Sequence, residues 1–179
     1  MVPDHFYYLV VSRLLAYKRV DLAIKAANRL KVPLKIAGTG KEEKRLRRLA
    51  TPKPGGRRVV EFLGFVSDDK LSKLYSSCQA VVFPTNEDFG IVPVEAMYFG
   101  KPVIAFAKGG ALETVVAGKT GEFFREETVD SLAAAWESFD PSKYKPADCI
   151  AQAEKFSKDR FQKEFSNFVN VKIKEQKSK

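Results

Sequence analysis

The chain has 179 residues, which is enough for one domain with a sizeable hydrophobic core. Hydrophobic residues make up 45% and charged residues 30%, as in an ordinary globular protein, and no apolar run reaches the ~18 residues of a membrane-spanning helix. The net charge of +9 fits an anionic ligand, a membrane surface or nucleic acid, but no RNA-binding aromatic motif or zinc-finger spacing accompanies the basic residues.

The cysteines and the first residues bear on where the protein works. Cys78 and Cys149 are the only cysteines and lack metal-site spacing, so we expect two reduced thiols in a cytoplasmic protein. The N-terminal residues lack the basic start and cleavage-like site of a signal peptide. Asp68 and Asp69 are adjacent, but no further ligand cluster lies nearby, so we expect no metal site.

The predicted elements alternate between strands and helices. Short apolar runs predict strands, and apolar residues at helical spacing predict the helices between them. The expected strands cover residues 6–11, 34–37, 59–63, 80–83, 102–106 and 121–124. The expected helices cover residues 20–30, 41–49, 68–78, 91–99, 111–116, 129–139, 146–156 and 160–172. This order predicts a Rossmann-like three-layer α/β sandwich, with a parallel sheet of about six strands and helices on both faces.

The loop after the first expected strand, residues 12–19, contains Arg13 and Lys18. Ligands of open α/β sheets bind at the carboxyl ends of the strands, where this loop would lie. A planar guanidinium and an ammonium group could hold a diphosphate there, or they could be two solvated charges. Gly38, in the sequence GTG after the second strand, is a weaker signal because such glycines often form only a turn.

Residues 80–100, AVVFPTNEDFGIVPVEAMYFG, indicate a buried strand, a polar loop and a helix. Glu87 in the loop and Glu95 in the helix lie on either side of a helix N-terminus, whose unpaired amides suit a phosphate. Carboxylates accept hydrogen bonds from hydroxyl groups, so the stretch suits a nucleotide sugar, which carries both phosphate and hydroxyls. The alternative is a surface acid and a solvated helix glutamate, and the motif alone does not decide between them.

Three segments together resemble the nucleotide-sugar-binding half of retaining glycosyltransferases of the GT-B fold. They are SRLLAYKRVDLAI, FLGFVSDDKLSKLYSSC, and EDFGIVPVEAMYFGKPVIAF followed by GGALETV. More narrowly, they are similar to the large group 1 family, numbered four, which includes many mannosyltransferases. The similarity runs over residues 8–136.

The resemblance implies a role for each matching residue. Arg13 and Lys18 match the pair that grips the donor's pyrophosphate and stabilises it as it leaves, and Glu87 matches the glutamate that faces the donor sugar. These three are the implied catalytic residues. Glu95 matches the glutamate that accepts the ribose hydroxyls. The other implied donor-binding residues form turns, a loop and a helix start around the nucleotide: Gly38, Gly64, Phe65, Val66, Phe89, Gly90, Ile91 and Val92.

The resemblance also implies how the chain is organised. Residues 1–156 correspond to the donor-binding domain and 157–179 to a C-terminal helix with a frayed basic tail, whereas the family's N-terminal acceptor domain is absent. His5 comes too early to match that domain's catalytic histidine. We therefore expect an excised domain or one half of a split enzyme, which binds nucleotide weakly, transfers no sugar alone and could self-associate through its exposed inter-domain face.

The expected reaction is transfer of mannose from GDP-mannose, with retention, to a polysaccharide or glycolipid acceptor, without a metal or other cofactor. A sugar-nucleotide epimerase or phosphorylase-like enzyme of the same fold and a non-catalytic nucleotide-binding module are the alternatives. The basic segment 41–58 could face an anionic membrane that carries a lipid-linked acceptor, although a solvated face is the simpler interpretation. We expect no nucleic-acid partner.

Overall fold

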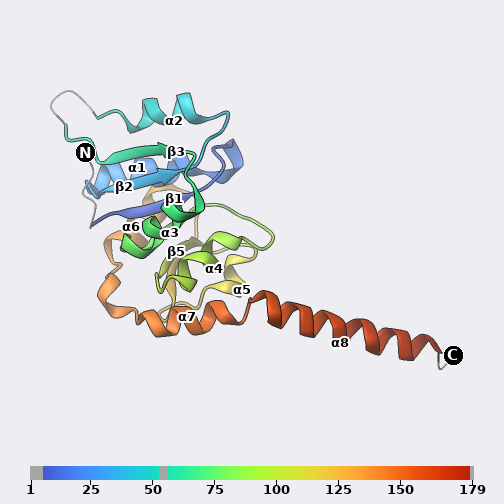
Figure 1. Ribbon diagram of the computed structural model, residues 1–179. Helices are drawn as coiled ribbons and strands as arrows, with labels where there is room; N and C mark the ends of the chain where they lie inside the picture. Colours follow the sequence, from blue (N-terminus) through green and yellow to red (C-terminus); the bar gives the residue numbers. More distant parts are fainter. Residues whose placement is uncertain (1–5, 53–55, 178–179) are drawn as a thin grey trace.

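A computed structural model describes residues 6–52 and 56–177 (Figure 1). Its strands are β1 (Tyr8–Val11), β2 (Leu34–Ala37), β3 (Val60–Gly64), β4 (Val81–Phe83), β5 (Val103–Phe106) and β6 (Gly121–Phe124). Every pair of neighbours is parallel, and the order across the sheet is β3-β2-β1-β4-β5-β6. The structure thus confirms the predicted Rossmann-like fold with a six-stranded parallel sheet.

The helices lie close to the predicted positions. They are α1 (Val20–Leu30), α2 (Glu43–Ala50), α3 (Asp68–Ser77), α4 (Ile91–Tyr98), α5 (Ala111–Thr114), α6 (Val129–Glu137), α7 (Pro146–Glu154) and α8 (Lys158–Lys177), with 3-10 turns η1 (Ala16–Lys18) and η2 (Pro141–Lys143). The last helix differs most from the prediction, because it continues to Lys177, beyond residue 172 where we expect the tail to begin.

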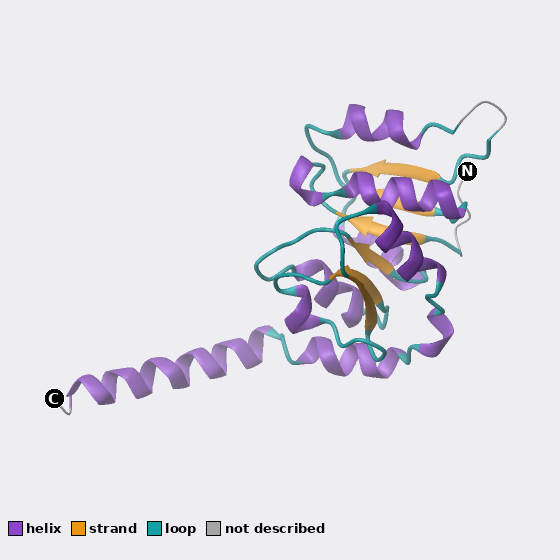
Figure 2. Ribbon diagram, turned by 180° about the vertical axis from the view of Figure 1, so that it is seen from behind, coloured by secondary structure: helices purple, strands orange, loops and turns teal. Residues whose placement is uncertain are grey.

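Two hydrophobic clusters, one on each face, hold the helices on the sheet. Successive side chains of a strand point to opposite faces. In β1, Tyr8 and Val10 join the cluster formed with α1, α2 and α6, whereas Leu9 joins the cluster formed with α3, α4, α5 and α7. Helices therefore cover both faces of the sheet, as Figure 2 shows from behind. This arrangement explains why β1, β4 and β5 are continuous apolar runs instead of alternating apolar and polar residues.

The strand order creates one crevice at the carboxyl ends of the strands. The chain moves outward from β1 to β2 and β3, and then returns to place β4 on the other side of β1. In open α/β sheets, ligands bind where the order reverses in this way. The loops that follow β1, β2, β3 and β4 lie at that edge, and together with the start of α4 they carry most of the residues predicted to bind the donor.

Helix α8 extends away from the rest of the chain as a single rod (Figures 1 and 2). Phe161, Phe165 and Phe168 are each more than half exposed along it. Among the described residues, no helix combines the length and the apolar character needed to cross a bilayer.

Candidate functional site

The loop after β1 is fixed by loops from two neighbouring strands. The backbone N–H of Leu14 donates to the carbonyl of Thr39 (2.9 Å), in the turn after β2. The hydroxyl of Thr85, just after β4, donates to the carbonyl of Tyr17 (3.2 Å). Lys18 ends the turn η1, and its side chain is only 10% exposed. The loop therefore holds the Lys18 ammonium group at the crevice instead of leaving it in solvent.

Gly38 allows the backbone after β2 to pass against the loop after β1. Its φ of +133° is a conformation that L side chains rarely adopt, and a Cβ there would lie 1.9 Å from the carbonyl oxygen of Ser12. The Gly38 N–H also donates to the carbonyl of Gly64 (2.7 Å). The turn after β2 thus packs against two other chain segments, and only glycine fits at this position.

Gly109 and Gly110 support the loop that carries Glu87. The N–H of Gly110 donates to the carbonyl of Glu87 (2.8 Å). A Cβ on Gly109 would lie 2.2 Å from that oxygen, and a Cβ on Gly110 would lie 2.1 Å from the carbonyl oxygen of Phe89. The sequence indicates only a flexible turn here, whereas the structure shows a close backbone contact that positions the loop.

The loops enclose two cavities that share Arg13, Lys18, Glu87 and Ile91. The first has a volume of about 470 Å³. It is lined by Val11, Ser12, Arg13, Lys18, Ala37, Gly38, Thr39, Phe65, Val66, Leu71, Glu87, Ile91 and Val92. The second, of about 440 Å³, is lined by Arg13, Tyr17, Lys18, Asn86, Glu87, Asp88, Phe89, Gly90 and Ile91. The structure therefore brings together ten of the twelve predicted site residues, all except Gly64 and Glu95.

Lys18 and Glu87 form an ion pair at the centre of this site. The carboxylate is 27% exposed and the ammonium group is more deeply placed. Arg13 is exposed and donates to the hydroxyl of Tyr17 (3.1 Å). A diphosphate entering the site would therefore meet an exposed guanidinium first and would compete with Glu87 for Lys18.

Glu95 lies one turn further along α4 and lines neither cavity. Its Oε2 accepts a hydrogen bond from the hydroxyl of Tyr75 on α3 (2.8 Å). Tyr75 is buried and its ring stacks on Phe99. Burial raises the pKa of Tyr75 far above its usual value, and the nearby Glu95 carboxylate raises it further. Tyr75 therefore stays protonated and keeps donating to Glu95, which holds the carboxylate in a fixed orientation.

Gly64 and Phe65 form the rim next to β3. Gly64 has a φ of +68° and reaches the site through its carbonyl, which accepts from Gly38. Phe65 lines the first cavity although its side chain is 85% exposed. An aromatic ring exposed at the mouth of a cavity offers a flat apolar surface to a ligand.

His5 lies outside the described residues. In the described part of the chain, no three His, Cys, Asp or Glu side chains gather closely enough to hold a metal ion. No spacing along the sequence indicates Tyr75, because its role depends on a contact between α3 and α4.

The family model described as "Glycosyl transferases group 1" matches residues 2–156. The chain belongs to this family. The matched region includes every residue of both cavities, and the six-stranded fold is that of GT-B glycosyltransferase structures.

Curated relatives are longer than this chain. An α-1,3/1,6-mannosyltransferase, ALG2 of Mus musculus, is 32% identical over 197 aligned residues, which cover 94% of this chain and 46% of the relative. A protein of Methanocaldococcus jannaschii named as an uncharacterized glycosyltransferase is 37% identical over 135 residues, covering 73% of this chain and 34% of the relative. The chain thus spans less than half the length of each of these proteins.

The structure of Anabaena HepE, solved in complex with UDP, superposes on this chain with a TM-score of 0.78. The two are 26% identical, and the match covers 94% of this chain and 49% of HepE. The same fold therefore forms about half of a larger protein that holds a nucleotide.

Proposed function

We propose that this chain is the donor-binding half of a retaining glycosyltransferase that takes mannose from GDP-mannose. One observation supports the proposal: Arg13, Lys18 and Glu87 lie together beside the N-terminus of α4. Cations and helix-end amides suit a diphosphate, and a carboxylate suits sugar hydroxyls. HepE, which was solved with UDP, supports a nucleotide ligand at this crevice.

In the proposed reaction the bond between the sugar's anomeric carbon and the diphosphate oxygen breaks. A new bond forms from that carbon to the oxygen of an acceptor hydroxyl, whose proton passes to the leaving diphosphate. Negative charge develops on the leaving phosphate, where Arg13, Lys18 and the amides at the start of α4 stabilise it. The helix begins at Ile91 without a side-chain cap, so its first amides remain available.

The donor assignment is supported by names of relatives. ALG2 of Mus musculus and an O-antigen chain enzyme of Escherichia coli are both named as mannosyltransferases. HepE was solved with UDP, so a comparison of GDP with UDP tests which nucleotide base this chain prefers. We place the base near Phe65 and Gly38, and the ribose at Glu95.

Calorimetric titration of this chain with GDP and with UDP tests the proposal, and Glu95→Ala is the matched variant. GDP binding that the variant loses is the expected result. A preference for UDP would overturn the GDP-mannose assignment while leaving the nucleotide-sugar site in place. If neither nucleotide binds the chain or a longer form of the protein, the donor-binding proposal fails.

The proposal extends to cofactor, acceptor and location. In the proposal, Arg13 and Lys18 stabilise the negative charge of the leaving phosphate without a metal ion. Removal of metal ions with EDTA should therefore leave sugar transfer by the complete protein unchanged. It places the polysaccharide or glycolipid acceptor site in a domain outside these 179 residues. A cytoplasmic location is included, supported by the two buried, unpaired thiols of Cys78 and Cys149.

A further inference from the structure

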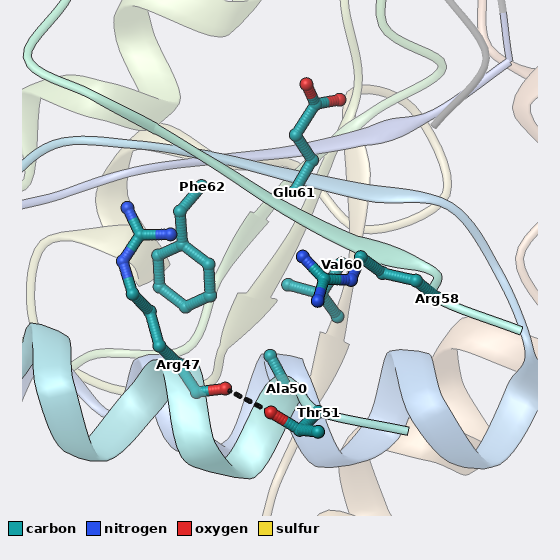
Figure 3. Close-up of a pocket in the computed structure, with 7 residues that line it drawn as sticks. All are labelled: Arg47, Ala50, Thr51, Arg58, Val60, Glu61 and Phe62. Atoms are coloured by element: carbon teal, nitrogen blue, oxygen red, sulfur yellow. Dashed lines mark hydrogen bonds between the residues drawn. The ribbon is translucent and has the colours of Figure 1, made fainter. Parts of the chain in front are cut away.

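A separate pocket lies at the outer edge of the sheet, between α2 and β3 (Figure 3). It has a volume of about 440 Å³. Its lining residues are Arg47, Ala50, Thr51, Arg58, Val60, Glu61 and Phe62. None of them lines the cavities of the donor site, so the proposed transfer reaction gives this pocket no task.

Two guanidinium groups stand on either side of an apolar floor in this pocket. Figure 3 shows Arg47 and Arg58 on opposite sides of the Phe62 ring, with Val60 beside Arg58, whereas Glu61 points away on the other side of the strand. The direction of Glu61 follows from the strand geometry, since residues 60 and 62 of β3 share one face and residue 61 takes the other. The only carboxylate of the lining is therefore directed out of the pocket.

The two arginines are held differently. The Arg47 guanidinium lies over the Phe62 ring, 4.7 Å from its centroid, and donates to Glu43 at 2.8 and 2.9 Å. These contacts fix its plane and leave other N–H groups free, because a guanidinium has five donors. The Arg58 side chain has no hydrogen-bond or ion-pair partner within the described part of the chain. The pocket thus combines one oriented guanidinium with one whose charge is uncompensated.

The surrounding segment is the most basic part of the chain. Residues 41–58 contain eight basic and two acidic residues, which supply six of the nine net positive charges. Lys44, Arg48 and Arg57 are exposed around the pocket on α2 and before β3. A broad positive surface of this kind is attracted to an anionic bilayer, where charges are spread over an area.

We propose that this pocket binds the phosphate of an anionic phospholipid head group. The phosphate diester would lie between the Arg47 and Arg58 forks, and its glycerol carbons would lie on Ala50, Val60 and Phe62. Planar guanidinium groups bind phosphate oxygens in pairs, which an ammonium group cannot do. The edge of the sheet next to β3 would then rest on the membrane surface. This proposal goes beyond the transfer reaction and does not depend on it.

Co-sedimentation of the 179-residue chain with vesicles tests the proposal. The chain should bind phosphatidylcholine vesicles that contain phosphatidylglycerol and should not bind phosphatidylcholine alone. Arg58→Lys keeps the charge but loses the fork, so it should lower the bound fraction about fivefold, whereas the neighbouring Arg57→Lys should change it little. Equal binding by both lysine variants would show that only the overall charge matters, and it would overturn the proposal that the phosphate binds in this pocket.

Charge reversal and a soluble competitor complete the test. Arg58→Glu should lower binding by on the order of tenfold, whereas Arg125→Glu, an equal charge change at an exposed residue far from the pocket, should have much less effect. Glycerol 1-phosphate should displace the chain from the vesicles. If it binds at the pocket but the vesicles do not bind the chain, the ligand is a soluble phosphate ester and the lipid assignment is overturned.

Discussion

At the scale of single residues, Lys18 and Glu87 partly neutralise each other. The ion pair joins a largely buried ammonium group to a partly exposed carboxylate, so the ammonium group has little contact with water. In the proposed donor complex, a diphosphate would displace Glu87 from Lys18, and the freed carboxylate would then face the hydroxyls of the donor sugar. The pair would thereby couple recognition of the diphosphate to recognition of the sugar.

Glu87→Gln should consequently change the affinities of two ligands to different extents. The variant removes a competing negative charge, so a nucleoside diphosphate should bind about fivefold more tightly, the equivalent of about 1 kcal/mol. A nucleotide sugar should gain less, because its hydroxyls lose their carboxylate acceptor. Titration calorimetry with both ligands measures the difference. Lys18→Gln serves as the comparison and should weaken both ligands, and equal gains for both ligands in Glu87→Gln would contradict the proposed sugar contact.

Tyr75 positions Glu95 rather than touching the ligand itself. Its buried hydroxyl donates to Glu95 Oε2 at 2.8 Å, and its raised pKa keeps the proton in place. If Glu95 accepts hydrogen bonds from the ribose, as proposed, loss of this donor should affect ribose recognition alone.

We therefore expect Tyr75→Phe to lower the affinity for a nucleoside diphosphate about fivefold and to leave the affinity for its 2′,3′-dideoxy analogue nearly unchanged. Tyr98→Phe is the matched control, since Tyr98 lies on α4 with its side chain 65% exposed. A structural role for Tyr75 would weaken both ligands alike, so an equal loss would count against the positioning role.

At the scale of elements, the turns after the strands determine the shape of the crevice. Gly38 combines a φ of +133° with a Cβ position 1.9 Å from a backbone oxygen, whereas Gly118, with a φ of +71°, has no neighbour within 4 Å. A side chain at Gly38 would meet both backbone strain and steric overlap, whereas a side chain at Gly118 would meet backbone strain alone.

Gly38→Ala should destabilise the fold by about 3 kcal/mol or more, because the carbonyl of Ser12 has to move as well as the strained backbone. Gly118→Ala should cost only about 1 kcal/mol, since the strain acts alone. Urea unfolding of both variants measures the difference. Similar costs would show that the loop after β1 moves easily, and the crevice would then be less rigid than the structure indicates.

The sequence predicts most of the fold because its signals are local. The run at residues 103–106 is short, apolar and bounded by turn residues, and it is a strand in the structure. Strand order is not local, but alternation of strands and helices restricts it strongly. The end of α8 was missed because basic residues near a helix terminus indicate fraying without excluding helix.

The candidate site is predictable only in part. Arg13, Lys18 and Glu87 can be identified because charged residues follow strand ends, and strand ends meet at one edge. The Lys18–Glu87 ion pair and the Tyr75–Glu95 hydrogen bond join residues on different elements, so no spacing along the chain reveals them. Gly109 and Gly110 support the Glu87 loop, and this contact between distant segments also cannot be predicted from spacing along the chain.

At the scale of the whole molecule, α8 is set apart from the two clusters that hold the sheet and its helices together. The core ends near Ala153 on α7, and the residues of α8 whose burial is described belong to neither cluster. Its exposed phenylalanines recur at helical spacing, with Phe161 stacked on Phe165. Helix α8 therefore contributes little burial to the fold described here.

Deletion of residues 158–179 should leave the melting temperature within about 2 °C of the intact chain, because the residues of α8 whose burial is described belong to neither core cluster. It should also reduce the binding of a hydrophobic dye such as ANS, since the exposed apolar face of α8 is removed. Differential scanning calorimetry and dye fluorescence measure the two effects, and replacement of Phe161, Phe165 and Phe168 by serine is the matched variant without truncation. A fall of more than about 5 °C would show that α8 packs on the domain in solution.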